Sequence, residues 1–258
     1  MRRAVLALFF LATGAALLAG LATMIDDRPA SRREGPQRQS FDRAPLSASL
    51  TSAGHRLGNP AHVRIYKQEA RLELWLAGSD GRYALFRSYD ICAFSGDLGP
   101  KLREGDRQAP EGFYKVRKAQ LNPASRHHLA FNLGFPNEYD RQHGRTGSAL
   151  MVHGGCSSVG CYAITDAHVD EVYAVVEAAL RQGQDGVDVH VFPFAMSQDG
   201  VAAAEAAGHP HADFWANLLE GHQLFMRHGR PPEVAACNGR YVFDRADPSC
   251  EPIRGWQA

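Results

Sequence analysis

The stretch that decides this fold is residues 148–165, which read SALMVHGGCSSVGCYAIT. It opens with an apolar run, residues 149–152, of the length typical of a buried strand. Glycine, serine and cysteine follow, and a helical pattern begins near Asp166. A histidine at the end of a strand and cysteines in a turn before a helix indicate thiol chemistry. The reason is that an imidazole or a helix N-terminus nearby lowers the pKa of a thiol.

Five ordered blocks resemble the catalytic domain of the YkuD-type L,D-transpeptidases. Within the opening stretch, Ser158–Val159–Gly160–Cys161 resembles the Ser/Thr-x-Gly-Cys signature of that family, and Val152–His153–Gly154 resembles the strand-borne His-Gly before it. The surroundings resemble the YafK-type murein L,D-transpeptidase branch, in blocks at residues 94–101, 104–114, 131–137 and 143–147. The resemblance spans roughly residues 58–196.

The resemblance implies a mainly β fold with α-helices. Its L,D-transpeptidase-like catalytic domain covers residues 58–196, and residues 197–258 form a helical C-terminal extension with a closing strand. The alternation of apolar and polar residues agrees with this fold, since it predicts short strands from residue 61 to residue 133 and again at residues 187–191. Helices are predicted from Asp166, as the cap, to about residue 180 and from His211 to His228.

The two site histidines differ in how firmly their segments hold them. His153 ends an apolar strand, whereas His143 lies in a polar loop at residues 139–147. A base on a strand end is better positioned, so we predict His153 as the general base. His143 is the alternative, since it lies eighteen residues before Cys161, a spacing that resembles the longer loop of many YkuD-type domains. The polar loop is predicted to bind substrate through His143 and through Arg145, whose guanidinium suits a carboxylate.

The chain has five cysteines, so at least one thiol stays free. Cys161 fits the family signature and is predicted to be that free thiol and the nucleophile. Cys156 lacks the signature and is predicted to be a small buried thiol, and Cys92 to be buried and inert. Cys237 and Cys250 flank the last predicted strand, and we expect them to pair.

In the predicted mechanism His153 deprotonates Cys161, which attacks a carbonyl to form a thioester. Gly154 and Gly160 allow tight turns, and N–H groups around Gly160 and Cys161 are predicted to hold the oxyanion. Ser158 is predicted to brace the turn or to orient the imidazole.

The resemblance implies a cell-wall enzyme active on peptidoglycan stem peptides at meso-diaminopimelate, with roles in cell wall biogenesis and cell shape. The chain departs from the common signature at Val159 and at Tyr162–Ala163, which leaves transfer and hydrolysis both open. The alternative is a hydrolase (amidase) that releases a protein or lipoprotein from peptidoglycan, so a peptidoglycan-linked outer-membrane protein is a candidate partner.

Two other classes of function compete with the enzyme. A zinc site would use His153, Cys156 and Cys161, with His143 or Cys237 as the fourth ligand, but the spacing does not match the usual paired knuckles. A non-catalytic peptidoglycan-binding module would need no thiol. We therefore expect an enzyme without a metal or another cofactor.

The N-terminus predicts export. Residues 1–25 join a basic start to an apolar run of about 22 residues, which indicates a signal peptide or a membrane anchor. The basic residues place the N-terminus in the cytoplasm, so the rest is predicted to be periplasmic or otherwise exported, with the N-terminal segment at the inner membrane. Residues 26–57 are predicted to be a disordered tether.

The net charge of the chain does not indicate nucleic-acid binding. The 258 residues have a formal net charge of zero, so there is no overall positive field to attract a polyanion.

Overall fold

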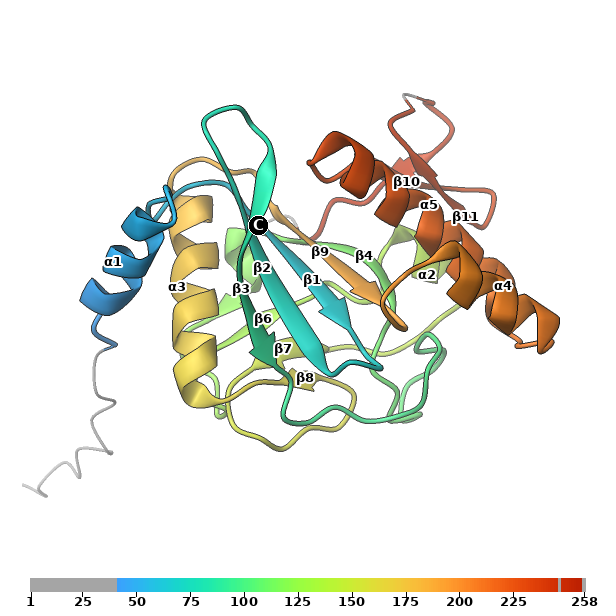
Figure 1. Ribbon diagram of the computed structural model, residues 1–258. Helices are drawn as coiled ribbons and strands as arrows, with labels where there is room; N and C mark the ends of the chain where they lie inside the picture. The colour runs from blue at the N-terminus through green and yellow to red at the C-terminus, as the bar shows by residue number, and fades with distance from the viewer. Residues whose placement is uncertain (1–40, 246, 257–258) are drawn as a thin grey trace, which may run out of the picture. The chain divides into compact units, whose positions relative to one another are not determined.

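The computed structural model describes residues 41–245 and 247–256, so the predicted export segment at residues 1–25 lies outside the described residues. A five-stranded sheet organises this part of the chain (Figure 1). Its order is β3 (Tyr83–Asp90), β2 (Arg71–Ala77), β1 (Ala61–Tyr66), β9 (Val187–Phe192) and β4 (Gly112–Val116). The pair β1–β9 is parallel and the other pairs are antiparallel.

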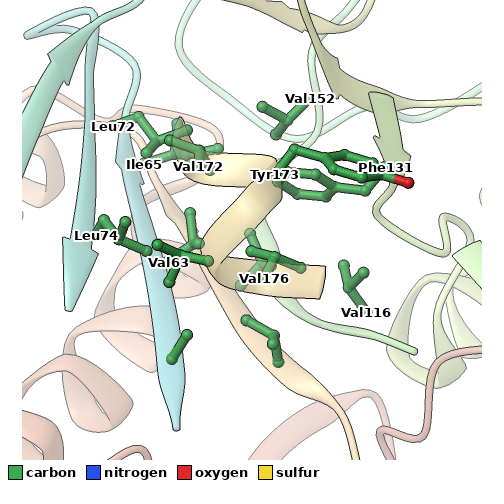
Figure 2. Close-up of a cluster of buried hydrophobic side chains, with 14 of the residues drawn as sticks. Val63, Ile65, Leu72, Leu74, Val116, Phe131, Val152, Val172, Tyr173 and Val176 are labelled. Carbon is green, nitrogen blue, oxygen red and sulfur yellow. The ribbon is translucent and has the colours of Figure 1, made fainter. Parts of the chain in front are cut away.

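Helix α3 (Asp166–Arg181) packs on one face of this sheet. Figure 2 shows its Val172 and Val176 among side chains of the sheet such as Val63 and Leu74. Thr165 caps the helix by accepting a hydrogen bond from the His168 N–H at 3.3 Å, so the predicted cap at Asp166 is wrong by one residue.

Helix α5 (Ala212–His228) covers the opposite face, and α4 (Gln198–Ala206) packs beside α5. Aromatic residues from both layers meet there, among them Phe113, Phe192 and Trp215. Because both faces are covered, every residue of β1 is buried, including the polar His62 and Arg64.

A four-stranded sheet carries the motif of the opening stretch. Its order is β5 (Leu121–Asn122), β6 (Ala130–Asn132), β7 (Met151–His153) and β8 (Tyr162–Ala163). Figure 2 shows Phe131 and Val152 of this sheet beside Tyr173 of α3, so α3 fills the space between the two sheets.

Several short elements surround these two sheets. The 3₁₀ turn η1 (Lys118–Gln120) precedes β5, and α2 (Glu138–Gln142) follows β6. A three-stranded sheet closes the chain with β11 (Arg240–Phe243), β10 (Val234–Cys237) and β12 (Glu251–Pro252).

The strands and helices predicted from periodicity are confirmed, but the tether prediction is wrong for its last part. Residues 26–40 lie outside the described residues, whereas Ala44–Ser52 form helix α1. Its Leu46 and Leu50 are 2% and 0% exposed and join the core. Two leucines four residues apart suffice to dock one helical turn, although the segment is polar overall. None of the helices in the described ranges has the length and apolarity needed to cross a membrane.

Candidate active site

Strands β7 and β8 bring the predicted nucleophile and base to one face of their sheet. They pair in parallel, with Val152 opposite Tyr162 and His153 opposite Ala163. Val152 and Tyr162 are fully buried in the core. Because side chains alternate along a strand, His153 and Cys161 both project to the other face. The register of the two strands therefore places the predicted nucleophile and the predicted base on the same face.

Cys161 is half-buried, one residue before β8. Its sulfur lies 3.4 Å from the Met151 N–H, which donates to it, and 3.5 Å from the Ala149 carbonyl oxygen. Burial raises the pKa of the Cys161 thiol, while the Met151 N–H and the charge of Lys101 act to lower it. The resting side chain is consequently a neutral thiol at neutral pH.

His153 is 3% exposed and its ring is oriented by its own neighbour. Nδ1 lies 2.6 Å from the carbonyl oxygen of Gly154. Since a carbonyl oxygen only accepts, Nδ1 carries the proton and Nε2 keeps the lone pair that a base needs. Burial lowers the pKa of His153, and the nearby His127 lowers it further, so the resting imidazole is neutral.

Among the residues that the structure describes, no hydrogen bond joins the His153 ring to the Cys161 sulfur. Catalytic hydrogen bonds are often long before substrate binds, so this separation is compatible with a base–nucleophile pair. The pair rests as thiol and imidazole rather than as thiolate and imidazolium, because burial disfavours both charged forms.

The turn before Cys161 is closed by Ser158. Its hydroxyl donates to the Cys161 carbonyl oxygen at 2.9 Å and accepts from the Cys161 N–H at 3.1 Å. Of the two roles predicted for Ser158, the structure shows the bracing one. Gly160 has a φ of 83°, the left-handed conformation that glycine adopts without strain.

The predicted oxyanion donors are already bonded. The Gly160 N–H donates to Ser95 Oγ at 2.7 Å, and the Cys161 N–H is held by Ser158. The Gly154 N–H donates to the Leu129 carbonyl oxygen. In the resting site these N–H groups are engaged, so the oxyanion role predicted for the Gly160 N–H requires that its bond to Ser95 be released. Gly154 instead permits close packing, because a Cβ there would lie 2.6 Å from Asp166 Oδ1.

The loop predicted to bind substrate is engaged within the protein. Arg145 is 8% exposed, and its Nη1 lies 2.8 Å from the fully buried Asp140 carboxylate. It is therefore not available as a carboxylate clamp, and that prediction is wrong. The His143 ring packs on Tyr139, and its Nε2 lies 2.8 Å from the Gly239 carbonyl oxygen. Gly239 lies in the turn between β10 and β11, which together are called the C-terminal hairpin. This contact of His143 leaves no support for the predicted substrate role.

Cys92 and Cys156 form a disulfide across 64 residues. Both are exposed, so the predictions of a buried thiol at each position are wrong. The disulfide also removes Cys156 from the zinc alternative, which required its thiolate. Cys161 is free and Cys237 pairs with Cys250, which confirms both predictions. The donor atoms of Cys237, Asp247 and Cys250 lie within 4.8 Å of one another, but the disulfide occupies both sulfurs.

Three neighbours of the site were missed from the sequence. His127 packs on the His153 ring at 4.6 Å, Ser95 holds Gly160, and the charge of Lys101 acts on Cys161. Lys101 is 4% exposed and pairs with Asp106 at 2.5 Å. Ser95 and Lys101 lie in a block of family resemblance, which was the available signal, whereas nothing distinguished His127 from a surface residue.

A pocket of about 400 Å³ adjoins these neighbours. Asp106 and Gln108 line it, and the Gln108 carbonyl oxygen would lie 3.6 Å from a Cβ placed on Gly160. The exposed Arg103 and the half-exposed Leu102 also line it. The pocket therefore offers a cation and an apolar surface, and its Gln108 lies beside Gly160, the residue before the nucleophile.

Comparison with known proteins shows what the chain resembles. The model of the YkuD family, described as the L,D-transpeptidase catalytic domain, matches residues 60–191. The Escherichia coli (strain K12) protein named "Putative L,D-transpeptidase YafK" is 43% identical over 189 residues, which are 73% of this chain and 76% of that protein.

Two solved structures are also similar. The helical cell shape determining protein Pgp2 (K307A mutant) of Campylobacter jejuni gives a TM-score of 0.44 at 21% identity, over 69% of this chain and 62% of that chain. The match thus covers less than two thirds of the length of Pgp2. Bd1075 of Bdellovibrio bacteriovorus gives 0.40 at 14% identity, over 76% of this chain and 91% of that chain.

Proposed function

Because the chain belongs to the YkuD family of L,D-transpeptidase catalytic domains, we propose that Cys161 transfers an acyl group from a peptidoglycan stem peptide. Membership makes the chain a peptidoglycan-related enzyme. The observation that carries the proposal further is the register of β7 and β8, which puts His153 and the one free cysteine on the same face.

The proposed reaction starts from the neutral pair. As the sulfur of Cys161 attacks a meso-diaminopimelate carbonyl, Nε2 of His153 takes the thiol proton and returns it to the leaving amine. The products of this step are a thioester and a free amine. A diaminopimelate amine, a protein lysine or water then resolves the thioester, so transfer and hydrolysis share the first step.

For the oxyanion we propose the N–H of Gly160, released from Ser95 when substrate binds. The Gly160 N–H adjoins the nucleophile, and its present acceptor is a hydroxyl that also donates to the Arg107 carbonyl oxygen. A hydroxyl with a second partner can give up one bond without being left unsatisfied.

The substrate is proposed to occupy the pocket beside Lys101, with Arg103 binding a carboxylate. Arg103 is exposed and lines the pocket, in contrast to the buried Arg145. Arg103→Gln is expected to raise KM several-fold with little change in kcat, since a bond made equally in ground and transition states affects binding alone. Arg141→Gln, on the exposed surface of α2, is the matched control. An unchanged KM for Arg103→Gln would contradict this placement.

Product analysis tests the reaction itself. The full chain is incubated with muropeptides that contain meso-diaminopimelate, and the products are separated and weighed by mass spectrometry. Cys161→Ala is expected to abolish turnover, and His153→Ala to lower kcat by about 10²–10⁴. A product joined to an amine identifies transfer, and a shortened peptide or a released lysine identifies hydrolysis. Turnover by Cys161→Ala at the wild-type rate would overturn the proposal.

We also propose that the chain acts outside the cytoplasm. The support is the sequence of residues 1–25, in which a basic start precedes an apolar run. A fusion of alkaline phosphatase to the C-terminus is expected to be active, and an inactive fusion would contradict export.

A further inference from the structure

One short segment after β3 runs beside the nucleophile and holds it at several points. This segment, Cys92–Ala93–Phe94–Ser95, is called the clamp below. The Cys92 N–H donates to the Ala163 carbonyl oxygen at 2.9 Å, and the Ala163 N–H donates to the Ala93 carbonyl oxygen at 2.8 Å. Ser95 accepts from the Gly160 N–H. The clamp therefore contacts the chain on both sides of Cys161.

Apart from the clamp, the described backbone hydrogen bonds that tie the loop from Gly154 to Gly160 to other segments lie at its start. The Gly154 N–H donates to the Leu129 carbonyl oxygen, and the Gly155 N–H donates to Asp166 Oδ1 at 2.8 Å. The loop joins β7 to β8 without regular secondary structure, and three of its seven residues are glycines. Val159 is 70% exposed, and Cys156 and Ser157 are exposed too. Such a loop samples many conformations unless something ties it down. Its covalent tie is the disulfide from Cys156 to Cys92 of the clamp, whose Cα atoms lie 5.3 Å apart.

We propose that the Cys92–Cys156 disulfide is a positioning element of the active site, so that the enzyme works at its full rate only in the oxidised state. The inference rests on the proposed acyl transfer and adds to it a redox requirement. With the disulfide closed, the loop is tied to the clamp at Cys156 and at Gly160, and Cys161 is held on the face that it shares with His153. With the disulfide open, the Gly160–Ser95 hydrogen bond is the remaining side-chain tie described between the loop and the clamp, and the bonds of Gly154 and Gly155 hold only the start of the loop.

The redox step is an ordinary thiol–disulfide exchange. A dithiol reductant breaks the S–S bond, Cys92 and Cys156 each gain a proton, and the reductant becomes a cyclic disulfide. Both cysteines are exposed, so a small dithiol can reach the bond. Exported proteins meet oxidising conditions, in which such a bond persists.

A pair of double variants separates this role from general stabilisation. Cys92→Ser with Cys156→Ser removes the clamp disulfide, and Cys237→Ser with Cys250→Ser removes the one at the C-terminal hairpin as the matched control. The clamp variant is expected to lose about tenfold or more in kcat with KM within about threefold, since a misplacement near 1 Å costs up to 10² in rate. The control is expected to keep the wild-type kcat. A clamp variant with kcat within twofold of wild type overturns the proposal.

Reversible reduction covers the case in which the clamp variant fails to fold. In the control variant, dithiothreitol can open only Cys92–Cys156. Activity is expected to fall on reduction and to return on reoxidation, with the far-ultraviolet circular dichroism unchanged. Full activity after complete reduction, verified by thiol counting, overturns the proposal.

The alkylation rate of Cys161 can be measured without substrate, so it tests the role of the disulfide independently of the proposed function. Iodoacetamide alkylation of Cys161, followed by peptide mapping, is expected to be at least about twofold faster after reduction, because a loosened loop exposes the thiol. If wild type does not turn over muropeptides, the proposed function fails, while this alkylation rate still tests the clamp. An alkylation rate that is the same in both redox states would contradict it.

Discussion

At the scale of single residues, the protons shared by Cys161 and His153 set the pH at which the site works. Burial lowers the pKa of His153 below its ordinary 6.5 and raises the pKa of Cys161 above its ordinary 9.0. In the active form Cys161 is a neutral thiol and His153 is a neutral imidazole. This form appears as His153 loses its proton and disappears as Cys161 loses its own.

The predicted pH profile is therefore a broad bell. The acid limb of kcat/KM should have its midpoint below 6.5 and the alkaline limb its midpoint above 9.0. Initial rates across the pH range, together with the pH dependence of Cys161 alkylation, check this. A thiolate already formed near pH 5, seen as rapid alkylation there, would show an ion pair instead.

Some residues of the site were predictable and others were not. The nucleophile and the base follow from a strand, a glycine turn and a signature that lie within 20 residues of one another. The disulfide partner of Cys156 lies 64 residues away, and Ser95 lies 65 residues from Gly160. Local patterns carry no information on which distant loop folds back onto a site. Arg145 was misjudged because its residue type suits a carboxylate, and a buried aspartate already occupies it.

At the scale of secondary-structure elements, periodicity predicted each strand well but not how many of its faces are covered. Val63 and Ile65 alternate with polar residues, the pattern of a half-exposed strand. Helix α5 nevertheless buries His62 and Arg64 on the second face. Helix α1 was missed for the related reason that two buried leucines are a weak signal in a polar segment.

Helix α1 should contribute to stability, in contrast to a disordered tether. Leu50 is fully buried, so Leu50→Ala is expected to cost about 2–5 kcal/mol of unfolding free energy. Thr51→Ala, on the exposed side of the same helix, should stay within about 0.5 kcal/mol of wild type. Urea denaturation of both variants measures the difference. Equal stabilities would mean that α1 is not docked on the core.

At the scale of the whole molecule, the buried polar layer between α5 and the five-stranded sheet should make the fold sensitive to acid. Burial lowers the pKa of His62 to about 3, and the Arg64 charge adds to the effect. Burial also lowers the pKa of His222 to about 3 and the pKa of His190 well below its usual range. The unfolded chain takes up these protons near pH 6.5, while the folded chain resists them to about pH 3.

The stability that these histidines confer is therefore complete above pH 6.5 and is lost as the pH falls from 6.5 toward 3. His62 alone should account for about 2 kcal/mol between roughly pH 7 and pH 5. Urea midpoints measured across this range should change less in His62→Gln than in wild type. His228→Gln, an exposed site on the same helix α5 that packs over His62, should keep the wild-type dependence. The same slope in all three proteins would rule out this source of acid sensitivity.

The central claim is that Cys161 is the one sulfur that carries the acyl group, and the intact mass of the protein tests it most directly. Wild type quenched during turnover of muropeptides should gain the mass of the donor acyl fragment, located by peptide mapping on Cys161. His153→Ala should gain it far more slowly, and Cys161→Ala should gain nothing. An adduct of the same mass on Cys161→Ala, or one mapped to another residue of wild type, would contradict the account.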